Sequence, residues 1–387
     1  MDKNTIFEAL DYRTNNPINV EVEKGYIKRI SECKEELDSA YYIAPGLVDL
    51  QVNGFKGIDL NNLELQVSDV DDLCEVLLKK GITNFYPTII TNSDERITSL
   101  LTTISLACEN SAKTNCCIAG IHLEGPFISL EDGPRGAHAK AFVKAPDWEL
   151  FTKWQHAAKG KIRMITLSPE WAASTNFIQK CVASGVVLSI GHTAASPEQI
   201  QEAIKVGATM STHLGNASHA KLPRHQNYIF EQLASDNLWS TIIADGFHLP
   251  DSLLKIFIKT KPNKTILVSD ATSFADFPAG DYTSHIGGEV TLDSSGRLFI
   301  KDNPNMLAGS AQSLLWCVHQ LIEKKILSLK DAWNMASIKP TEALFGSSNN
   351  LLQVGHKANL VIFEKNNKGL EIIKTIQSGA IVFSKIN

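Results

Sequence analysis

The sequence has no excess of positive charge and no long apolar run, and both absences narrow the classes of protein to consider. Its 37 Lys and Arg residues are outnumbered by 42 Asp and Glu residues, so the net charge is -5 at pH 7. Such a chain lacks the basic surface that attracts nucleic acids and anionic membranes. No apolar run reaches bilayer-spanning length, and the first residues lack the features of an export signal. We therefore expect a cytoplasmic protein that binds a small molecule and neither nucleic acid nor membrane.

Two common sequence motifs are also missing. The seven cysteines contain no Cys-x-x-Cys pair, and only Cys116 and Cys117 lie close together. They form neither a disulfide framework nor a thiolate zinc site, and they suit a reducing compartment. No Gly-x-Gly-x-x-Gly follows an early strand, which argues against an open dinucleotide-binding sheet without eliminating it.

Both ends of the chain show strand patterns, whereas the middle alternates strand-like and helix-like segments. Strands are predicted over residues 5–11, 18–23, 26–30 and 40–43, and again over 358–364, 370–377 and 381–383. We predict that residues 1–45 and 349–387 together form a small β-sandwich domain.

Residues 46–348 contain eight strand candidates, which is the number that closes a barrel. They cover residues 46–52, 81–90, 116–123, 161–167, 185–190, 208–213, 240–244 and 265–269. Predicted helices include residues 67–80, 93–109, 197–205, 250–260 and 311–325. Repeated strand-then-helix units with short apolar strands predict an α/β fold with a (β/α)8 TIM-type barrel.

The third predicted barrel strand ends at a carboxylate. Glu124 follows an apolar run and precedes Gly125-Pro126, which cannot continue a central strand. Glu124 should therefore lie at the C-terminal end of the barrel, where barrel enzymes carry their chemistry.

Each of the last four predicted barrel strands also delivers a His or Asp to this rim. These residues are His192, His213, the pair Asp245 and His248, and Asp270. A lone His beside a strand is usually a packing residue, but four such strand ends together are harder to explain that way. Glu and two His suit Zn²⁺ or Fe²⁺ and leave a coordination position open for water. We assign Glu124, His192 and His213 to one divalent metal ion per subunit, with Zn²⁺ preferred.

Asp270 and His248 are then available for catalysis. A carboxylate beside a metal-activated water can take its proton and pass it to a departing nitrogen. His248 is placed to hydrogen-bond a substrate carbonyl as it becomes an oxyanion. The alternative for Asp270 is a fourth metal ligand, because its strand-end position permits either role.

Six motifs resemble those of the N-acetylglucosamine-6-phosphate deacetylase family, within the amidohydrolase superfamily. They are Ala-Pro-Gly-Leu-Val-Asp-Leu-Gln-Val-Asn-Gly at 44–54, His-Leu-Glu-Gly-Pro-Phe at 122–127, Gly-His-Thr at 191–193, Thr-His-Leu-Gly-Asn-Ala at 212–217, Ala-Asp-Gly-Phe-His at 244–248 and Leu-Val-Ser-Asp-Ala at 267–271. The resemblance implies hydrolysis of the acetamide of N-acetylglucosamine 6-phosphate to glucosamine 6-phosphate and acetate, in amino-sugar catabolism, by a homodimer.

The resemblance also implies roles for particular residues. It places the metal ligands on Glu124, His192 and His213, the acid/base on Asp270 and the carbonyl-facing histidine on His248. It implies that the sugar phosphate binds near Ala137, His138, Asn216, Ala217, Arg224, Asp245, His248, Leu307, Ala308 and Gly309.

The chain departs from the family pattern at two places. Gln51-Val52-Asn53 replaces the His-x-His that often binds a second metal in the superfamily, and neutral amides are poor transition-metal ligands, so we expect one metal. The family's Gly-Arg-Glu-Pro-Gly segment is replaced by Lys-Leu-Pro-Arg-His-Gln at 221–226. Arg224, eleven residues after His213, has the spacing of the phosphate arginine, in its own subunit or the partner's.

Three functions therefore stay open at this point. The first is the deacetylase of a 6-phosphorylated N-acetyl amino sugar. The second is a deacylase of N-acetylgalactosamine 6-phosphate, an unphosphorylated N-acetyl amino sugar or an N-acyl amino acid. The third is a catalytically inactive barrel that binds or regulates.

Overall fold

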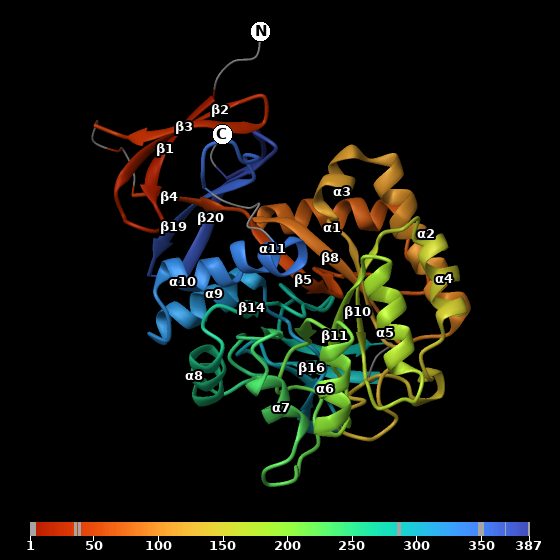
Figure 1. Ribbon diagram of the computed structural model, residues 1–387. Helices are drawn as coiled ribbons and strands as arrows, with labels where there is room; N and C mark the ends of the chain where they lie inside the picture. The colour runs from red at the N-terminus through yellow and green to blue at the C-terminus, as the bar shows by residue number, and fades with distance from the viewer. Residues whose placement is uncertain are drawn as a thin grey trace.

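An α/β barrel and a sheet built from both ends of the chain make up most of the molecule. The computed structural model describes residues 5–34, 37, 40–284, 288–346, 352–367 and 369–385. In Figure 1 the terminal strands, red and dark blue, lie together at one side of the barrel, and both termini lie at that side.

Eight parallel strands form the barrel, which confirms the predicted fold class. Hydrogen-bonded neighbours follow the order β14-β13-β12-β11-β10-β9-β8-β5. A parallel bridge between Val52 and Ala271 joins the two edges of this sheet and closes it. The strands are β5 (Leu47–Val52), β8 (Ile82–Ile90), β9 (Ile121–Glu124), β10 (Ile162–Leu167), β11 (Val187–Ile190), β12 (Met210–Ser211), β13 (Trp239–Ile242) and β14 (Thr265–Leu267).

Helices cover the outside of the barrel (Figure 1). They are α1 (Val67–Lys79), α2 (Asp94–Asn110), α3 (Ala112–Cys117), α4 (Trp148–Ala157), α5 (Ser174–Ala183), α6 (Pro197–Lys205), α7 (Tyr228–Ala234), α8 (Asp251–Thr260), α9 (Leu314–Glu323), α10 (Leu329–Met335) and α11 (Ile338–Phe345). Helix α6 shows why the local sequence forms a helix. Ser196 accepts a bond from the Gln199 N–H, Pro197 supplies a preset φ at the first position, and Ile200 and Ala203 are buried.

Seven strands from the two ends of the chain form one sheet. Its order is β21-β20-β19-β4-β1-β2-β3, so β19 of the C-terminal segment pairs with β4 of the N-terminal segment. The strands are β1 (Thr5–Asp11), β2 (Pro17–Glu23), β3 (Tyr26–Glu32), β4 (Tyr42–Pro45), β19 (Leu360–Asn366), β20 (Gly369–Gln377) and β21 (Ala380–Ser384). The predicted domain boundary at 348/349 lies outside the described residues.

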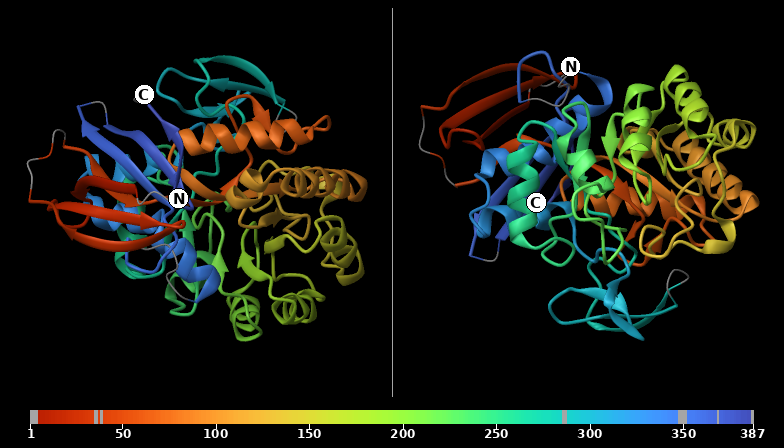
Figure 2. Two further views of the ribbon diagram at one scale, coloured as in Figure 1. Left: turned by 90° about the horizontal axis from the view of Figure 1, so that it is seen from above. Right: turned by 60° about the horizontal axis from the view of Figure 1, so that its bottom comes forward.

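A four-stranded antiparallel sheet follows the last barrel strand, and the sequence patterns did not predict it. It consists of β15 (Gly280–Ser284), β16 (Gly288–Leu292), β17 (Leu298–Ile300) and β18 (Asn303–Leu307). Figure 2 shows this sheet projecting from the barrel. Its core is small, centred on Val290, Leu292 and Leu298, so its strands carry little of the apolar pattern that identifies a buried strand.

The predicted strand over residues 116–123 is wrong in its first half. Cys116 and Cys117 belong to α3, and β9 begins only at Ile121. Ser111 starts the helix, since its side chain accepts a bond from the Thr114 N–H. Local capping therefore overrides the strand preference of this apolar run.

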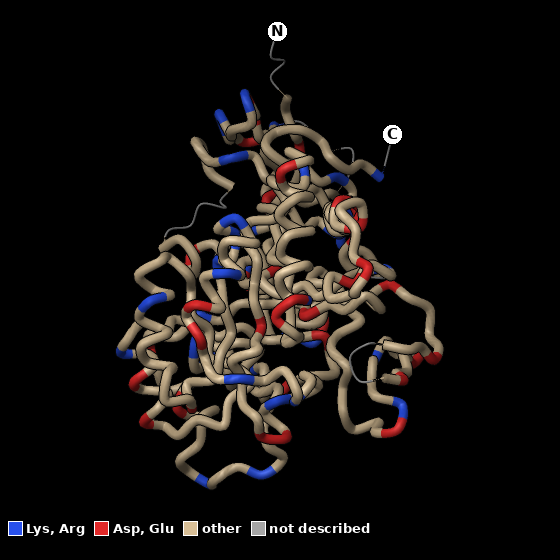
Figure 3. The backbone as a smooth tube through the Cα atoms, turned by 90° about the vertical axis from the view of Figure 1, so that its right-hand side faces the viewer, with Lys and Arg blue, Asp and Glu red and all other residues tan. Residues whose placement is uncertain are grey.

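Basic and acidic residues alternate along the chain on the side of the molecule seen in Figure 3. Blue and red residues are interspersed along the backbone in Figure 3. Among the described residues, no helix is both long and apolar enough to cross a membrane.

The short strands β6 (Gly54–Phe55) and β7 (Ile58–Asp59) form a small hairpin directly after the first barrel strand.

Candidate metal centre and active site

A cavity of about 540 Å³ lies where the predicted polar strand ends meet. Three of the residues on its wall, His192, His213 and Asp270, have positive φ angles of 49°, 28° and 49°. Non-glycine residues adopt this conformation at a cost, and such strain clusters at functional sites. Here it turns each side chain from the end of its strand toward the cavity.

Three donor atoms converge on one point of this wall. The Nε2 atom of His213 lies 3.0 Å from Oε1 of Glu124 and 3.1 Å from Nε2 of His192. The His192 Nε2 atom lies 3.3 Å from the same Glu124 oxygen. All three side chains are buried, and they form the one group of potential metal ligands of this kind among the described residues.

The surroundings of these side chains fit a metal ion. The Nδ1 atom of His192 lies 2.9 Å from the carbonyl oxygen of Pro134, which holds the ring with Nε2 facing the other two donors. An outer hydrogen bond of this type commonly fixes the orientation of a ligating histidine. The two imidazoles and the carboxylate are buried, and one side of the group faces the cavity. This arrangement matches a site for one divalent ion.

Asp270 is held next to the ligands by two amide groups. Nδ2 of Asn53 and Nε2 of Gln51 donate to its Oδ1 atom, at 2.8 Å and 3.0 Å. Gln51 Nε2 also donates to Oε1 of Glu124, at 2.9 Å. Burial first, and then the Glu124 carboxylate, raise the pKa of Asp270 to about 6. The residues that replace His-x-His thus act as donors to carboxylates, a role that the sequence did not reveal.

His248 is oriented by Asp245, three residues earlier. The Asp245 Oδ2 atom lies 2.8 Å from His248 Nδ1, and its Oδ1 atom accepts the backbone N–H groups of Phe247 and His248. Burial raises the pKa of Asp245, but the His248 charge and these hydrogen bonds outweigh it and lower the pKa to about 2. An ionised carboxylate only accepts, so the Nδ1 atom carries a proton and Nε2 is left for the cavity.

Most of the residues expected to contact the sugar do line the cavity. They are Ala137, His138, Asn216, Ala217, His248, Leu307, Ala308 and Gly309. Asp245 does not line the cavity itself but contacts His248, which does. Arg224 does not line it; the loop over residues 221–226 is exposed and projects beside α7 (Figure 1).

Several cavity residues were not anticipated. Asn303, Asn305 and Met306 of β18 form one wall, and His219 lies at another. His219 is held between Tyr228 and Glu131, with Nδ1 3.1 Å from the Tyr228 hydroxyl and Nε2 3.0 Å from Glu131 Oε2. No local motif marks the β18 residues, because β18 reaches the cavity only through the tertiary fold.

A TIM-type barrel with Glu, His, His and a nearby Asp at its strand ends defines the class as a metal-dependent amide hydrolase. The model of the Amidohydrolase family matches residues 42–382. The chain is 30% identical to N-acetylglucosamine-6-phosphate deacetylase of Bos taurus, over 93% of this chain and 88% of that protein. It is also 30% identical to the Bacillus subtilis enzyme of the same name, over 88% and 84%. The chain belongs to the N-acetylglucosamine-6-phosphate deacetylase family.

Solved structures of the same family share the fold over the whole chain. The enzyme of Thermotoga maritima superposes with a TM-score of 0.85 at 25% identity, covering 98% of this chain and all of that one (100%). The enzyme of Pasteurella multocida gives 0.85 at 25% identity, covering 97% and 99%.

Proposed function

We propose that this protein hydrolyses the N-acetyl group of N-acetylglucosamine 6-phosphate, giving glucosamine 6-phosphate and acetate, in amino-sugar catabolism. The observation that carries the proposal is the convergence of Glu124, His192 and His213 within hydrogen-bond distance of one another. Asp270 lies beside this group of potential metal ligands without belonging to it. We infer the substrate from the family relationship, because the relatives are named N-acetylglucosamine-6-phosphate deacetylase.

The proposed chemistry divides the work among four residues. A divalent ion held by Glu124, His192 and His213, which we propose to be Zn²⁺ or otherwise Fe²⁺, would acidify a water and polarise the amide carbonyl. Asp270 has both amide hydrogen bonds on Oδ1, so Oδ2 is the oxygen that takes the proton and returns it to the leaving nitrogen. His248, paired with ionised Asp245, presents an Nε2 proton to the carbonyl oxygen in its imidazolium form.

A second substrate class has an observation in its favour. The lining of the cavity includes no Lys or Arg, as far as the described residues go, and Arg224 is exposed to solvent. A single subunit thus offers no guanidinium or ammonium group for a 6-phosphate. An unphosphorylated N-acetyl amino sugar, or another N-acyl compound, is the alternative that this lining favours.

A homodimer would supply the missing positive charge for the 6-phosphate. We propose that the Arg224 loop of one subunit reaches the cavity of the other. Arg224 and Phe230, which is 55% exposed, lie on adjoining segments of the projecting loop and α7. An exposed aromatic beside an exposed arginine suits an interface. We also place the protein in the cytoplasm, where the seven free cysteines would stay reduced.

The first test compares acetate release from N-acetylglucosamine 6-phosphate and from N-acetylglucosamine by the metal-loaded protein. We expect a kcat/KM at least about tenfold higher for the phosphorylated sugar, because a charge-assisted bond to phosphate contributes more than about 1.4 kcal/mol. Arg224→Ala should remove this preference, and Lys221→Ala in the same loop should keep it. Equal rates on both sugars would favour the alternative substrate class, and no acetate from either would contradict the proposed function.

A further inference from the structure

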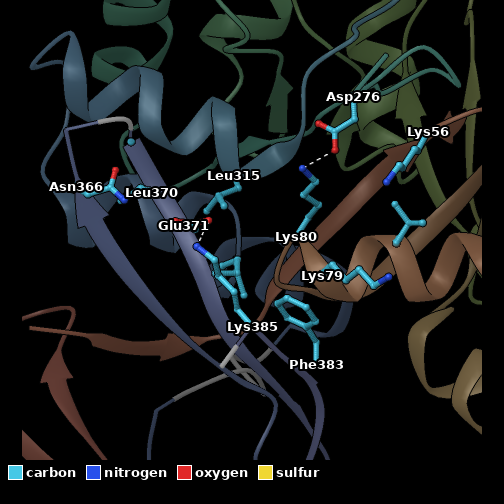
Figure 4. Close-up of a pocket in the computed structure, with 13 residues that line it drawn as sticks. Lys56, Lys79, Lys80, Asp276, Leu315, Asn366, Leu370, Glu371, Phe383 and Lys385 are labelled. Atoms are coloured by element: carbon cyan, nitrogen blue, oxygen red, sulfur yellow. Dashed lines mark hydrogen bonds and ion pairs between the residues drawn. The ribbon is translucent and has the colours of Figure 1, made fainter. Parts of the chain in front are cut away.

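A second cleft lies away from the active site, where the terminal sheet meets the barrel. It has a volume of about 540 Å³ and shares no lining residue with the catalytic cavity. Its walls come from the β6–β7 hairpin, the end of α1, the loop after β14, α9 and the hairpins of β19, β20 and β21 (Figure 4). Segments far apart in the sequence thus build one open cleft of small-molecule size, since ligand sites typically measure roughly 300 to 1,000 Å³.

The charged residues around this cleft are mostly lysines. Lys80 pairs with Asp276 at 2.6 Å and Lys385 pairs with Glu371 at 2.5 Å (Figure 4). The cleft has two further lysines, Lys56 and Lys79, and no further acid. Among the described residues, neither of these two forms an ion pair, so the cleft has a surplus of two positive charges in a chain whose net charge is -5.

Apart from Asn366 and Gly369, the rest of the cleft is apolar. Val76 of α1, Leu315 of α9, Leu370 of β20 and Phe383 of β21 contribute its side walls. Leu315 is 7% exposed and Ile372 is 4% exposed, so part of the wall continues the protein core. Solvated lysines on a flat surface need no partner, but lysines beside apolar walls in a cleft focus their field on whatever enters it.

We propose that this cleft binds a phosphorylated small molecule of monosaccharide size. The phosphate faces Lys56 and Lys79, because neither is paired with an acid of the cleft, and lysine binds phosphate as a point charge. Glu75, one helical turn before Lys79, lies outside the cleft lining and is paired with Lys113. The carbon skeleton lies along Leu370 and Phe383. Binding here needs no turnover, so it stands or falls separately from the deacetylase activity.

The test measures binding of glucose 6-phosphate, with glucose as the uncharged counterpart, to the metal-loaded full chain by isothermal titration calorimetry. We expect the phosphorylated sugar to bind and glucose to bind at least tenfold more weakly. Lys56→Gln/Lys79→Gln should weaken the cleft binding at least tenfold, whereas Lys56→Arg/Lys79→Arg should retain it. Lys153→Gln/Lys255→Gln, which removes two exposed lysines elsewhere, is the matched control and should bind as the unaltered protein does.

Glucose 6-phosphate can also enter the active site, and competition kinetics separates the two locations. Its inhibition constant against acetate release should be the same in the unaltered protein and in Lys56→Gln/Lys79→Gln, because neither lysine lines the catalytic cavity. The proposal is overturned if calorimetry detects no binding. It is also overturned if the Lys56→Gln/Lys79→Gln protein binds as tightly as the unaltered one, which would place all binding at the active site.

Discussion

Two amide side chains at the end of β5 decide how Asp270 can act. Gln51 and Asn53 both donate to Oδ1 of Asp270, and Gln51 also bridges to Glu124. A carboxylate held this way keeps a fixed orientation at the edge of the metal site without having to ligate the ion. The geometry therefore favours the acid/base role over the role of a fourth ligand.

Asp270→Asn should keep the metal and lose activity by a factor of about 10² to 10⁴, because the amide cannot accept a proton. His192→Ala should lose both metal and activity, since it removes one of three ligands. Metal content by mass spectrometry and acetate release from the same samples check both outcomes. A metal-free Asp270→Asn protein would identify Asp270 as a ligand and refute our assignment.

Asp245 is expected to matter through His248 rather than by touching the substrate. Asp245→Asn should lower kcat by about 10²-fold or more, because a neutral amide no longer stabilises the imidazolium that donates to the oxyanion. KM should change little, since the cavity lining is intact. Steady-state kinetics of Asp245→Asn, with the melting temperature as a check on folding, measures this. A kcat equal to that of the unaltered protein would show that His248 acts in its neutral form.

Strand β18 links the four-stranded sheet to the active site. Asn303, Asn305 and Met306 line the cavity just before Leu307, Ala308 and Gly309. The sheet itself projects from the barrel and has its own small core. Its last strand thus adds a wall to the cavity that the barrel alone does not supply.

Asn303→Ala/Asn305→Ala should therefore raise KM by about tenfold while kcat stays within about twofold, because lost substrate hydrogen bonds weaken binding without altering the metal site. Michaelis–Menten kinetics with N-acetylglucosamine 6-phosphate measures both constants. Glu289→Ala on β16, outside the cavity, is the control and should leave them unchanged. A fall in kcat alone would mean that β18 acts on the reacting centre.

A stacked aromatic pair connects the terminal sheet to the barrel helices. Phe363 of β19 is fully buried and stacks on Trp333 of α10, with ring centroids 4.3 Å apart and planes 10° apart. The Trp333 indole N–H donates to the carbonyl oxygen of Pro45, at the end of β4. Both ends of the chain are thereby fixed to the same helix.

Phe363→Ala should lower the free energy of unfolding by about 3 to 5 kcal/mol, the usual cost of removing a buried ring and leaving a cavity. Urea unfolding monitored by circular dichroism gives the difference. Phe345→Ala is the matched control, because Phe345 is 58% exposed and its loss should be nearly neutral. Similar losses in the two variants would show that the contact with Trp333 contributes no special stability.

Short-range patterns sufficed for the barrel because its strands are apolar and its helices carry their own signals. The helix predicted over residues 197–205 begins and ends as predicted, since Ser196 and Pro197 define its start. The strand predicted over 116–123 was wrong where Ser111 caps a helix instead. The sheet of β15 to β18 was missed, because strands that bury few residues leave little periodicity.

Local sequence patterns were enough to place Glu124, His192, His213 and Asp270 at strand ends, and a parallel barrel brings the carboxyl ends of its strands to one rim. The direction in which each of these side chains points could not be predicted from the sequence. Only the folded chain shows that Gln51 and Asn53 donate to Asp270, that β18 lines the cavity, and that Arg224 lies outside it. These outcomes depend on contacts between residues far apart in the chain, and such contacts leave no periodic trace in either partner's local sequence.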